Sequence, residues 1–180
     1  MGMKQNIEIE YKSLLSPFDF NRLKASFFKD AVLFVQENRY YDTLNKDLYD
    51  RRISLRIRRV NNKSLFTLKQ IDAHNQVVEH EVEDDNLDVD DPRIVKLLAD
   101  LHLPTQLICI SSSQTHRLLI SDKFGEWCLD RNEFKNHVDF ELEYEITGVT
   151  NTRIDRFLAF LETNSITYHK ASPKYIRSLE

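Results

Sequence analysis

Apolar and charged residues alternate strictly in several segments of this chain, beginning with residues 6 to 12. In NIEIEYK the odd-numbered residues are apolar or aromatic, and the even-numbered residues from position 8 onward are charged. Successive side chains of a β-strand point to opposite faces, so this segment predicts a strand with one apolar and one charged face. The same period of two recurs in RRISLRIRR (51–59), VVEHEVE (77–83) and DFELEYE (139–145). We therefore expect many strands that carry one charged face.

The remaining pattern predicts further strands and a few helices. Helices are expected at 16–30, 90–103 and 150–165, where apolar residues recur at helical spacing. The first of these opens with a capping serine followed by proline, Ser16 and Pro17. Strands of hairpin-like, antiparallel spacing are expected at 4–13, 33–43, 52–60, 63–71, 77–84, 106–120, 123–132 and 138–147. The chain shows no βαβ alternation, internal repeat or linker, so we expect one α+β domain over residues 1–180.

Composition limits the class of protein. Hydrophobic residues make up 41% and charged residues 30% of the 180 positions, which is typical of a globular protein. The formal net charge of -4 gives no basic character that would favour a nucleic-acid partner. The two cysteines have no metal-ligand spacing and favour a reducing compartment over a disulfide framework. No apolar run is long enough to span a bilayer, so we expect a cytoplasmic protein without a membrane partner.

The signs of the charges are sorted among the predicted strands. Some strands stack carboxylates on one face, whereas others stack guanidinium and ammonium groups. Like charges roughly 6–7 Å apart along a strand repel by about 2 kcal/mol at an effective dielectric constant near 20. Alternation in any one strand is typical of a half-solvated sheet, but sorted rows are favourable if a polyanion and divalent cations lie between them. We therefore expect the charged faces to line the inside of a closed eight-stranded antiparallel barrel.

The apolar faces would then lie under helices packed on the outside of the barrel. The residues expected to form this apolar wall are Ile7, Ile9, Ile53, Leu55, Ile57, Phe140, Leu142 and Tyr144. A barrel of about eight strands has room for side chains and one small ligand. The charged interior is thus the expected active site.

The residue types on the charged faces suit phosphate chemistry with a hard metal ion. Carboxylate oxygens select Mg²⁺, Mn²⁺ or Ca²⁺, and Mg²⁺ commonly takes one or two carboxylates plus substrate phosphates. The carboxylate set is Glu8, Glu10, Asp130, Glu141 and Glu143. The basic set, suited to holding phosphates, is Lys12, Arg56, Arg58, Lys69 and Arg117. Two bound metals would let one neutralise the phosphate chain while the other activates a water for in-line attack.

Several motifs occur together in a specific order. EIEYK is an ExExK motif, and it is followed by YYDT (40–43), LRIRR (55–59), FTLK (66–69), the strand of Arg117, CLD (128–130) and DFELEYE. This combination resembles the signature of the CYTH superfamily, the triphosphate tunnel metalloenzymes, over nearly the whole chain. It is most similar to bacterial single-domain members labelled as adenylate cyclases or thiamine triphosphatase-like proteins.

The resemblance implies an eight-stranded antiparallel tunnel that depends on Mg²⁺ or Mn²⁺ and acts on triphosphate groups. It implies metal binding by Glu8, Glu10, Asp130, Glu141 and Glu143, and phosphate binding by Lys12, Arg56, Arg58, Lys69 and Arg117. It also implies that the motif residues Glu8, Glu10 and Lys12 take part in catalysis. A C-terminal basic residue should close the site, and both Lys170 and Lys174 are candidates. Many members carry an arginine near a glutamate where this chain reads VVEHEVE, which leaves the roles of Glu79 and Glu81 open.

The expected function is hydrolysis of inorganic triphosphate or of a triphosphorylated small molecule such as thiamine triphosphate or a nucleoside triphosphate. Two alternatives stay open at this point. One is an adenylate cyclase of the class IV type, which makes cyclic AMP from ATP. The other is a polyphosphate- or nucleotide-binding module without catalysis. The chain could act as a monomer or a homodimer.

Overall fold

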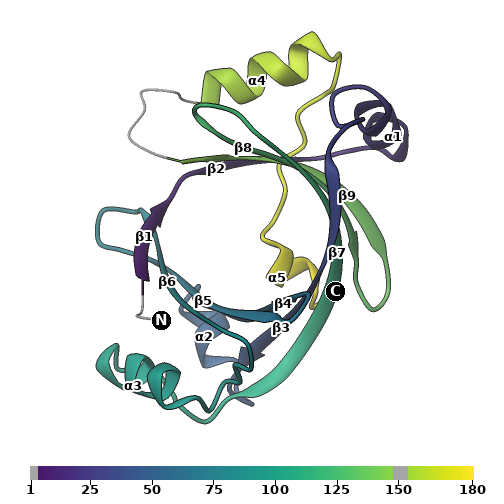
Figure 1. The fold of residues 1–180 in the computed structure, drawn as a ribbon. Coiled ribbons are helices and arrows are strands. Elements are labelled where there is room, and N and C mark those ends of the chain that lie inside the picture. Colours follow the sequence, from purple (N-terminus) through teal and green to yellow (C-terminus); the bar gives the residue numbers. More distant parts are fainter. Residues whose placement is uncertain (1–3, 148–153) are drawn as a thin grey trace. The chain divides into compact units, whose positions relative to one another are not determined.

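The computed structural model describes residues 4–147 and 154–180. These residues form nine strands and five helices (Figure 1). The strands are β1 (Lys4–Glu8), β2 (Glu10–Leu14), β3 (Val32–Asp42), β4 (Ser54–Val60), β5 (Lys63–Ile71), β6 (Val77–Asp84), β7 (Ile108–Ser121), β8 (Gly125–Glu133) and β9 (Val138–Ile146). The helices are α1 (Pro17–Ala25), α2 (Asp47–Asp50), α3 (Pro92–Asp100), α4 (Ile154–Thr163) and α5 (Lys174–Arg177). Within these residues, none of the helices combines the length and apolar character that crossing a bilayer requires.

The strands belong to one sheet with the order β1-β6-β5-β4-β3-β7-β8-β9-β2. Strands β1 with β6, β3 with β4, β4 with β5, β5 with β6, β8 with β9 and β2 with β9 pair in antiparallel fashion. This mostly antiparallel sheet with few helices agrees with the expected α+β class. The single strand predicted over 4–13 is corrected to two strands, β1 and β2, which raises the expected eight strands to nine. The segment divides at Ile9 because its two halves pair with different partners.

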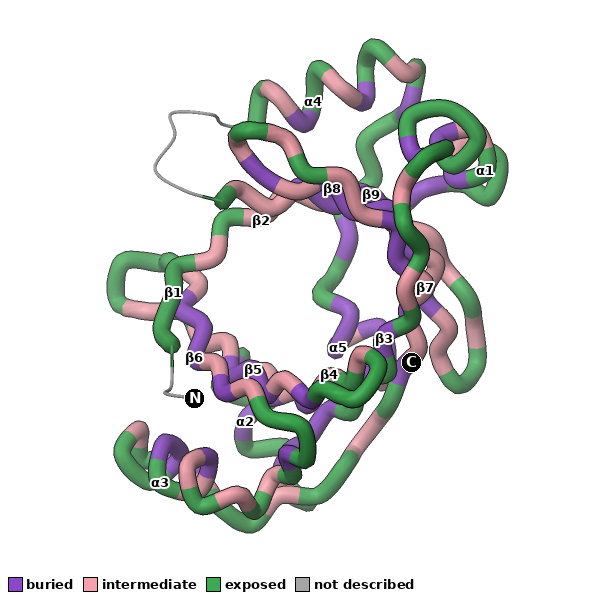
Figure 2. Tube along the Cα trace, viewed as in Figure 1, coloured by how far each residue is buried: buried purple, intermediate pink, exposed green. Residues whose placement is uncertain are grey.

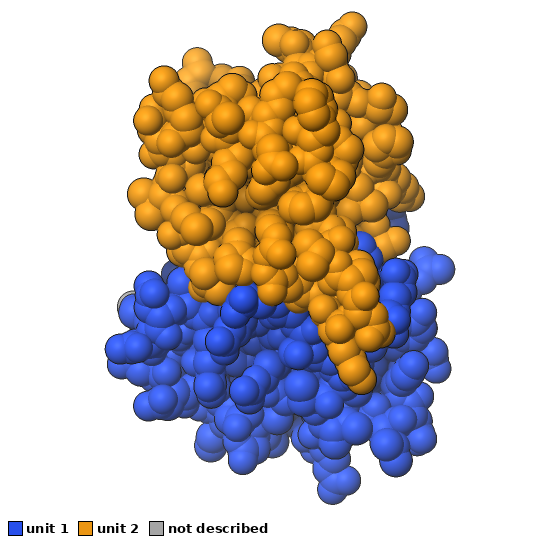
Figure 3. Space-filling model, turned by 90° about the vertical axis from the view of Figure 1, so that its right-hand side faces the viewer, with its two compact units in different colours: residues 1–8, 36–114, 174–180 blue, residues 9–35, 115–173 orange. Residues whose placement is uncertain are grey.

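The chain divides into two compact units, coloured separately in Figure 3. Unit 1 comprises residues 1–8, 36–114 and 174–180, and unit 2 comprises residues 9–35 and 115–173. The division falls inside β3 and inside β7, so each of these strands contributes residues to both units.

Unit 1 has an apolar core between α3 and one face of β4, β5 and β6. Asp91 caps α3 by accepting a hydrogen bond from the Arg93 backbone, and Pro92 occupies its first turn. The helix buries Ile94, Leu97 and Leu98. They join the buried residues Leu55, Ile57, Phe66, Leu68 and Val82 of the three strands in one cluster. Each such side chain contributes about 1.5–3 kcal/mol on full burial.

Unit 2 has a second apolar core, in which α1 and α4 lie on one face of β8 and β9 (Figures 1 and 2). Trp127 of β8 stacks on Tyr144 of β9 with ring centroids 4.2 Å apart, and lies 4.4 Å from the ring of Phe160 of α4. Helix α1 begins where Ser16 accepts a hydrogen bond from the Asp19 backbone, with Pro17 in the first turn. As in unit 1, the helices cover the apolar face and leave the charged face to the other side.

Most of the expected apolar wall lies in these two cores. Ile53, Leu55, Ile57, Leu142 and Tyr144 are buried in them, and Phe140 packs against the second. The expectation is wrong for Ile7 and Ile9, which are 56% and 46% exposed. They lie in and next to the end strands of the sheet order and outside both clusters.

The helices differ from the prediction in their ends and their number. Helix α1 ends at Ala25, where the Ser26 backbone N–H turns back to the carbonyls of Arg22 and Leu23. Helix α4 covers 154–163, while positions 150–153 of the predicted helix lie outside the described residues. Helices α2 and α5 were not predicted, because four residues are too few to show a helical period.

Candidate functional site

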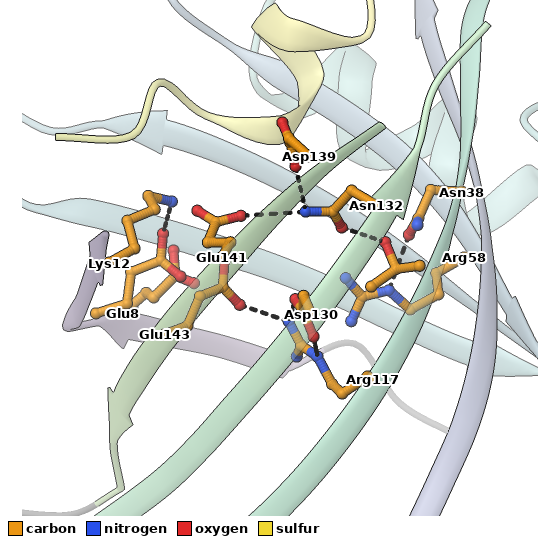
Figure 4. A network of polar contacts seen from close by, with 12 residues as sticks. Glu8, Lys12, Asn38, Arg58, Arg117, Asp130, Asn132, Asp139, Glu141 and Glu143 are labelled. Carbon is orange, nitrogen blue, oxygen red and sulfur yellow. Dashed lines mark hydrogen bonds and ion pairs between the residues drawn. The ribbon is translucent and has the colours of Figure 1, made fainter. Parts of the chain in front are cut away.

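Three buried carboxylates from neighbouring strands come together in unit 2 (Figure 4). Asp130 of β8 lies directly opposite Glu141 of β9, and Glu143 follows two residues further along the same face. Each residue has a carboxylate oxygen within 4.8 Å of those of the other two. Their exposed fractions are 0%, 0% and 7%. Because three buried negative charges repel one another strongly, this acidic cluster fits a divalent cation with oxygen ligands.

Arg117 of β7 binds two members of the acidic cluster (Figure 4). Its Nε donates to Asp130 Oδ1 at 2.8 Å and its Nη2 to Asp130 Oδ2 at 2.5 Å, which is a two-pronged ion pair. The same Nη2 donates to Glu143 Oε2 at 2.5 Å. Burial disfavours the charged guanidinium, but the charges of Asp130 and Glu143 outweigh it and raise the pKa of Arg117 well above its usual value. Arg117 therefore stays cationic and offsets part of the cluster's charge.

An uncharged residue that the sequence reasoning missed, Asn132, orients the acidic cluster. Its Nδ2 donates to Asp139 Oδ1 at 2.9 Å and to Glu141 Oε2 at 3.5 Å. Its Oδ1 accepts a hydrogen bond of 2.8 Å from the Thr115 hydroxyl, which fixes the orientation of the amide. Asn132 lies two residues after Asp130 and therefore on the same strand face. This shared strand face is the signal in the sequence that could have identified Asn132.

The last two charged residues of the ExExK motif, Glu10 and Lys12, lie on the charged face of unit 2. In β2, Lys12 is opposite Glu143 and Glu10 is opposite Glu145. The Lys12 ammonium forms an ion pair with Glu10. The motif thus places a cation beside the acidic strand β9, at a residue of the acidic cluster.

The first residue of the motif, Glu8, lies in unit 1 and pairs with Lys69. The Lys69 Nζ is 2.5 Å from Glu8 Oε1 and 2.7 Å from Glu79 Oε1. Glu79, whose role the sequence left open, is the direct cross-strand neighbour of Lys69. Burial, followed by the charge of Glu79, raises the pKa of the neighbouring Glu81. These side chains form one end of the charged face of unit 1.

The two predicted arginines of β4 lie on this same charged face of unit 1. Arg56 is opposite Thr67 and donates to its hydroxyl through Nη2 at 3.3 Å. Arg58 is opposite Asn38 and donates to its Oδ1 through Nε at 3.0 Å (Figure 4). Both are half-buried and face away from the core that contains Leu55. Short polar neighbours therefore hold both guanidinium groups.

The structure separates the two C-terminal lysines by burial. Lys174 lies in α5 of unit 1 and is buried. Lys170 is exposed, and its backbone forms an isolated antiparallel bridge with Ser13 in unit 2. Of these two lysines, Lys174 is the one whose positive charge is buried.

The predicted site residues thus fall into two groups. Unit 1 carries Glu8, Arg56, Arg58, Lys69 and Lys174, and unit 2 carries Glu10, Lys12, Arg117, Asp130, Glu141, Glu143 and Lys170. The groups brought into contact are the acidic cluster with Arg117, Lys12 with Glu10, and Lys69 with Glu8. These faces therefore carry carboxylates, which can bind a hard cation, and basic groups, which can bind a polyanion.

Fold and site together define an α+β protein whose mostly antiparallel sheet carries a buried acidic cluster and several basic side chains on its charged faces. The chain belongs to the CYTH family, since the family model of the CYTH domain matches residues 6–170.

Similar proteins carry two kinds of names. The "Putative triphosphatase YjbK" of Bacillus subtilis (strain 168) is 29% identical over 187 residues, which cover 99% of this chain and 97% of that protein. The crystal structure of a "putative adenylate cyclase" from Bacillus halodurans has a TM-score of 0.85 and 28% identity, and covers 98% of this chain and 99% of that chain. HpAC1 from Hippeastrum, described as a "putative adenylyl cyclase" that reveals a dominant triphosphatase activity, has a TM-score of 0.72 and 22% identity, and covers 95% of this chain and 94% of that chain.

Proposed function

We propose that this protein hydrolyses a triphosphate substrate with the help of Mg²⁺ or Mn²⁺. The substrate would be inorganic triphosphate or a triphosphorylated small molecule. The observation that carries the proposal is the buried acidic cluster of Asp130, Glu141 and Glu143, held together by Arg117. Membership of the CYTH family and the similarity to a protein named as a triphosphatase support it.

The acidic cluster is the proposed metal-binding centre. Its buried carboxylate oxygens suit Mg²⁺ or Mn²⁺, which bind a few carboxylates and complete their shells with water and substrate phosphates. When bound, the metal would neutralise phosphate charge and lower the pKa of a water for attack. Glu8 and Glu10 belong to the same proposed set of metal ligands.

The basic residues are proposed to hold the phosphate chain. Arg56 and Arg58 can each offer two parallel donors to a phosphate, whereas Lys69 offers a point charge. Lys174 would add a positive charge from the C-terminal segment. One N–H group of Arg117, which donates to the acidic cluster in this structure, would donate to a phosphate oxygen of the substrate instead. We propose that Glu8, Glu10 and Lys12 take part in catalysis, with Lys12 donating to a phosphate oxygen as its negative charge grows.

We further propose that the chain works as a single domain whose sheet closes into a tunnel. The end strands of the sheet order, β1 and β2, are joined through Ile9 alone. Strands β3 and β7 each contribute to both units, which supports one cooperative domain. In such a tunnel the basic and acidic faces would act on one substrate.

Cyclisation of ATP is a second candidate function, because a structure 28% identical to this chain carries an adenylate cyclase name. The same residues would hold the triphosphate, but the ribose 3′-hydroxyl would attack the α-phosphate. The products would then be cyclic AMP and pyrophosphate, whereas hydrolysis would release phosphate.

A substrate panel tests the proposal. The protein is incubated with tripolyphosphate, ATP or thiamine triphosphate and with Mg²⁺ or Mn²⁺, and phosphate and cyclic AMP are measured. We expect metal-dependent phosphate release that Glu143→Gln abolishes and that Glu162→Gln, on the exposed side of α4, leaves unchanged. Cyclic AMP from ATP would establish the cyclase instead. Thermal stabilisation by tripolyphosphate and metal without any product would identify a binding module and overturn the proposal.

A further inference from the structure

Two neighbouring buried tyrosines of unit 1 carry hydroxyls that have no hydrogen-bond partner in the described part of the chain. Tyr40 of β3 is 3% exposed and Tyr175 of α5 is 8% exposed. Their ring centroids are 6.2 Å apart. Neither hydroxyl has a hydrogen-bond partner within residues 4–147 and 154–180. Because an unpaired buried hydroxyl destabilises a folded protein, two adjacent ones suggest that something outside the chain pairs with them.

Tyr40 adjoins Arg56 on the charged face of unit 1. Tyr40 lies directly opposite Arg56 in the antiparallel register, so the two side chains point to the same side of the sheet. Arg56 donates to Thr67 through Nη2, but its buried Nε has no partner in the described part of the chain. One phenol group and one guanidinium N–H are therefore available on facing side chains, and the second phenol belongs to the ring that neighbours Tyr40.

The chemistry of this group favours an anionic oxygen ligand. Burial, followed by the charge of Asp42, raises the pKa of Tyr175 above its usual range, so its hydroxyl keeps its proton. Asp42 itself accepts hydrogen bonds from the backbone N–H groups of Thr43, Leu48 and Tyr49, so its oxygens serve the start of α2. The unpaired Arg56 Nε–H is a donor only, and each protonated phenol can donate to an anionic oxygen.

We propose that Tyr40, Tyr175 and Arg56 form a subsite for one phosphoryl group of the substrate. The two hydroxyls donate to its oxygens, and Arg56 supplies the positive charge. Tyr175 packs between Tyr40 and Tyr49, whose ring centroid lies 5.9 Å away, so the donors are held in position before the ligand arrives. This subsite rests on the proposed function and adds two uncharged substrate contacts to it.

Removing the hydroxyls alone tests the subsite. Tyr40→Phe, Tyr175→Phe and the double variant keep the rings and their packing. Binding of imidotriphosphate, a tripolyphosphate analogue that resists hydrolysis, is measured by calorimetry with Mn²⁺ present. We expect about tenfold weaker binding for each lost hydroxyl, as for a hydrogen bond to a charged group. The melting temperature without ligand should stay the same or rise, because a buried unpaired group is removed. A merely structural role would lower it and leave the affinity unchanged.

Tyr49→Phe is the matched control, since this partly exposed tyrosine belongs to the same ring cluster, and it should bind like the wild type. Wild-type affinity in the double variant would overturn the subsite while leaving the proposed function intact. Weaker binding of an ATP analogue with unchanged imidotriphosphate binding would assign the tyrosines to an organic group, which also overturns it. A wild-type protein that binds no triphosphate with metal would overturn the proposed function and the subsite with it.

Discussion

Arg117 supplies a buried counter-charge to the acidic cluster. Burying a carboxylate is costly unless a counter-charge or hydrogen bonds accompany it, and this cluster buries three. Arg117 contacts Asp130 and Glu143 and donates to carboxylate oxygens that a bound metal ion would also use. It therefore acts as an internal counter-ion whose loss exposes the repulsion among the acids.

Replacing Arg117 by methionine should separate these effects. We expect Arg117→Met to lower the free energy of unfolding by about 3 kcal/mol without metal, because uncompensated buried charges remain. Adding Mn²⁺ should restore more stability to the variant than to the wild type. Urea unfolding with and without Mn²⁺ measures both values. Arg131→Met removes a more exposed ion pair with Glu133 and should cost about 1 kcal/mol or less. Equal losses in the two variants would contradict this role of Arg117.

Asn132 acts through Glu141 and is a positioning residue. Without its amide, Glu141 and Asp139 lose a common donor, so the acidic cluster is less well ordered for a metal. We expect Asn132→Ala to weaken Mn²⁺ binding about tenfold in calorimetry, as for other groups that orient metal ligands. The exposed Asn136→Ala in the β8–β9 turn is the control. An unchanged Mn²⁺ affinity in Asn132→Ala would remove this role.

At the scale of elements, a single aspartate in the turn before β8 joins α4 to the sheet. Asp122 accepts hydrogen bonds from the Phe124 and Trp127 N–H groups at 2.8 and 3.1 Å, and from Arg156 of α4 at 2.5 Å. Burial would raise the pKa of Asp122, but these donors outweigh it and lower the pKa below its usual value. The ionised form is thus the one that holds α4 on unit 2.

The stability that Asp122 contributes should depend on pH. Because its pKa is lower in the folded than in the unfolded state, the contribution is complete above the unfolded pKa of about 3.9 and is lost as pH falls through the folded value. We expect Asp122→Asn to cost about 1–2 kcal/mol at pH 7. The difference from the wild type should shrink below about pH 4. Urea unfolding from pH 7 to pH 2.5 measures it, and a difference that stays constant over this range would contradict the argument.

The sequence predicted elements well where the signal is local. Strands β5 and β6 have the predicted bounds of 63–71 and 77–84, because alternation is a property of neighbouring residues. It could not predict the break at Ile9, which follows from pairing with β6 on one side and β9 on the other. Pairing between strands that lie far apart in the sequence does not change the pattern of apolar and polar residues within each strand.

The same contrast holds for the candidate site. Strand parity alone placed Glu141 and Glu143 on one face of β9, and the register with β8 then brings Asp130 opposite Glu141. The contact of Lys69 with both Glu8 and Glu79 needed the register of three strands. Uncharged residues such as Asn132 and Tyr40 were missed, because sorting by charge passes over groups that act through hydrogen bonds.

At the scale of the whole molecule, both units follow one rule, in which the longer helices α1, α3 and α4 cover the apolar faces of the sheet. The chain belongs to the CYTH family. A metal ion bound in the proposed site would neutralise charge on both the acidic cluster and the triphosphate. Metal and triphosphate are therefore expected to bind cooperatively.

Cooperative binding should appear in global stability. At a tripolyphosphate concentration about 100 times the dissociation constant, binding to the folded state alone adds about 2.7 kcal/mol to the free energy of unfolding. We expect this gain with Mn²⁺ present and a much smaller one without it, measured by denaturant titration. A gain that is the same with and without the metal would show that the acidic cluster has no part in substrate binding.

We propose that the charged faces of the sheet hold the metal and the triphosphate, and that the side covered by α1, α3 and α4 does not. Crystals soaked with Mn²⁺ and imidotriphosphate and measured at the manganese absorption edge would locate both ligands. We expect an anomalous peak coordinated by Asp130, Glu141 and Glu143, with phosphate density beside Arg117. Manganese bound only at exposed carboxylates, or a triphosphate on the helix side of the sheet, would contradict it.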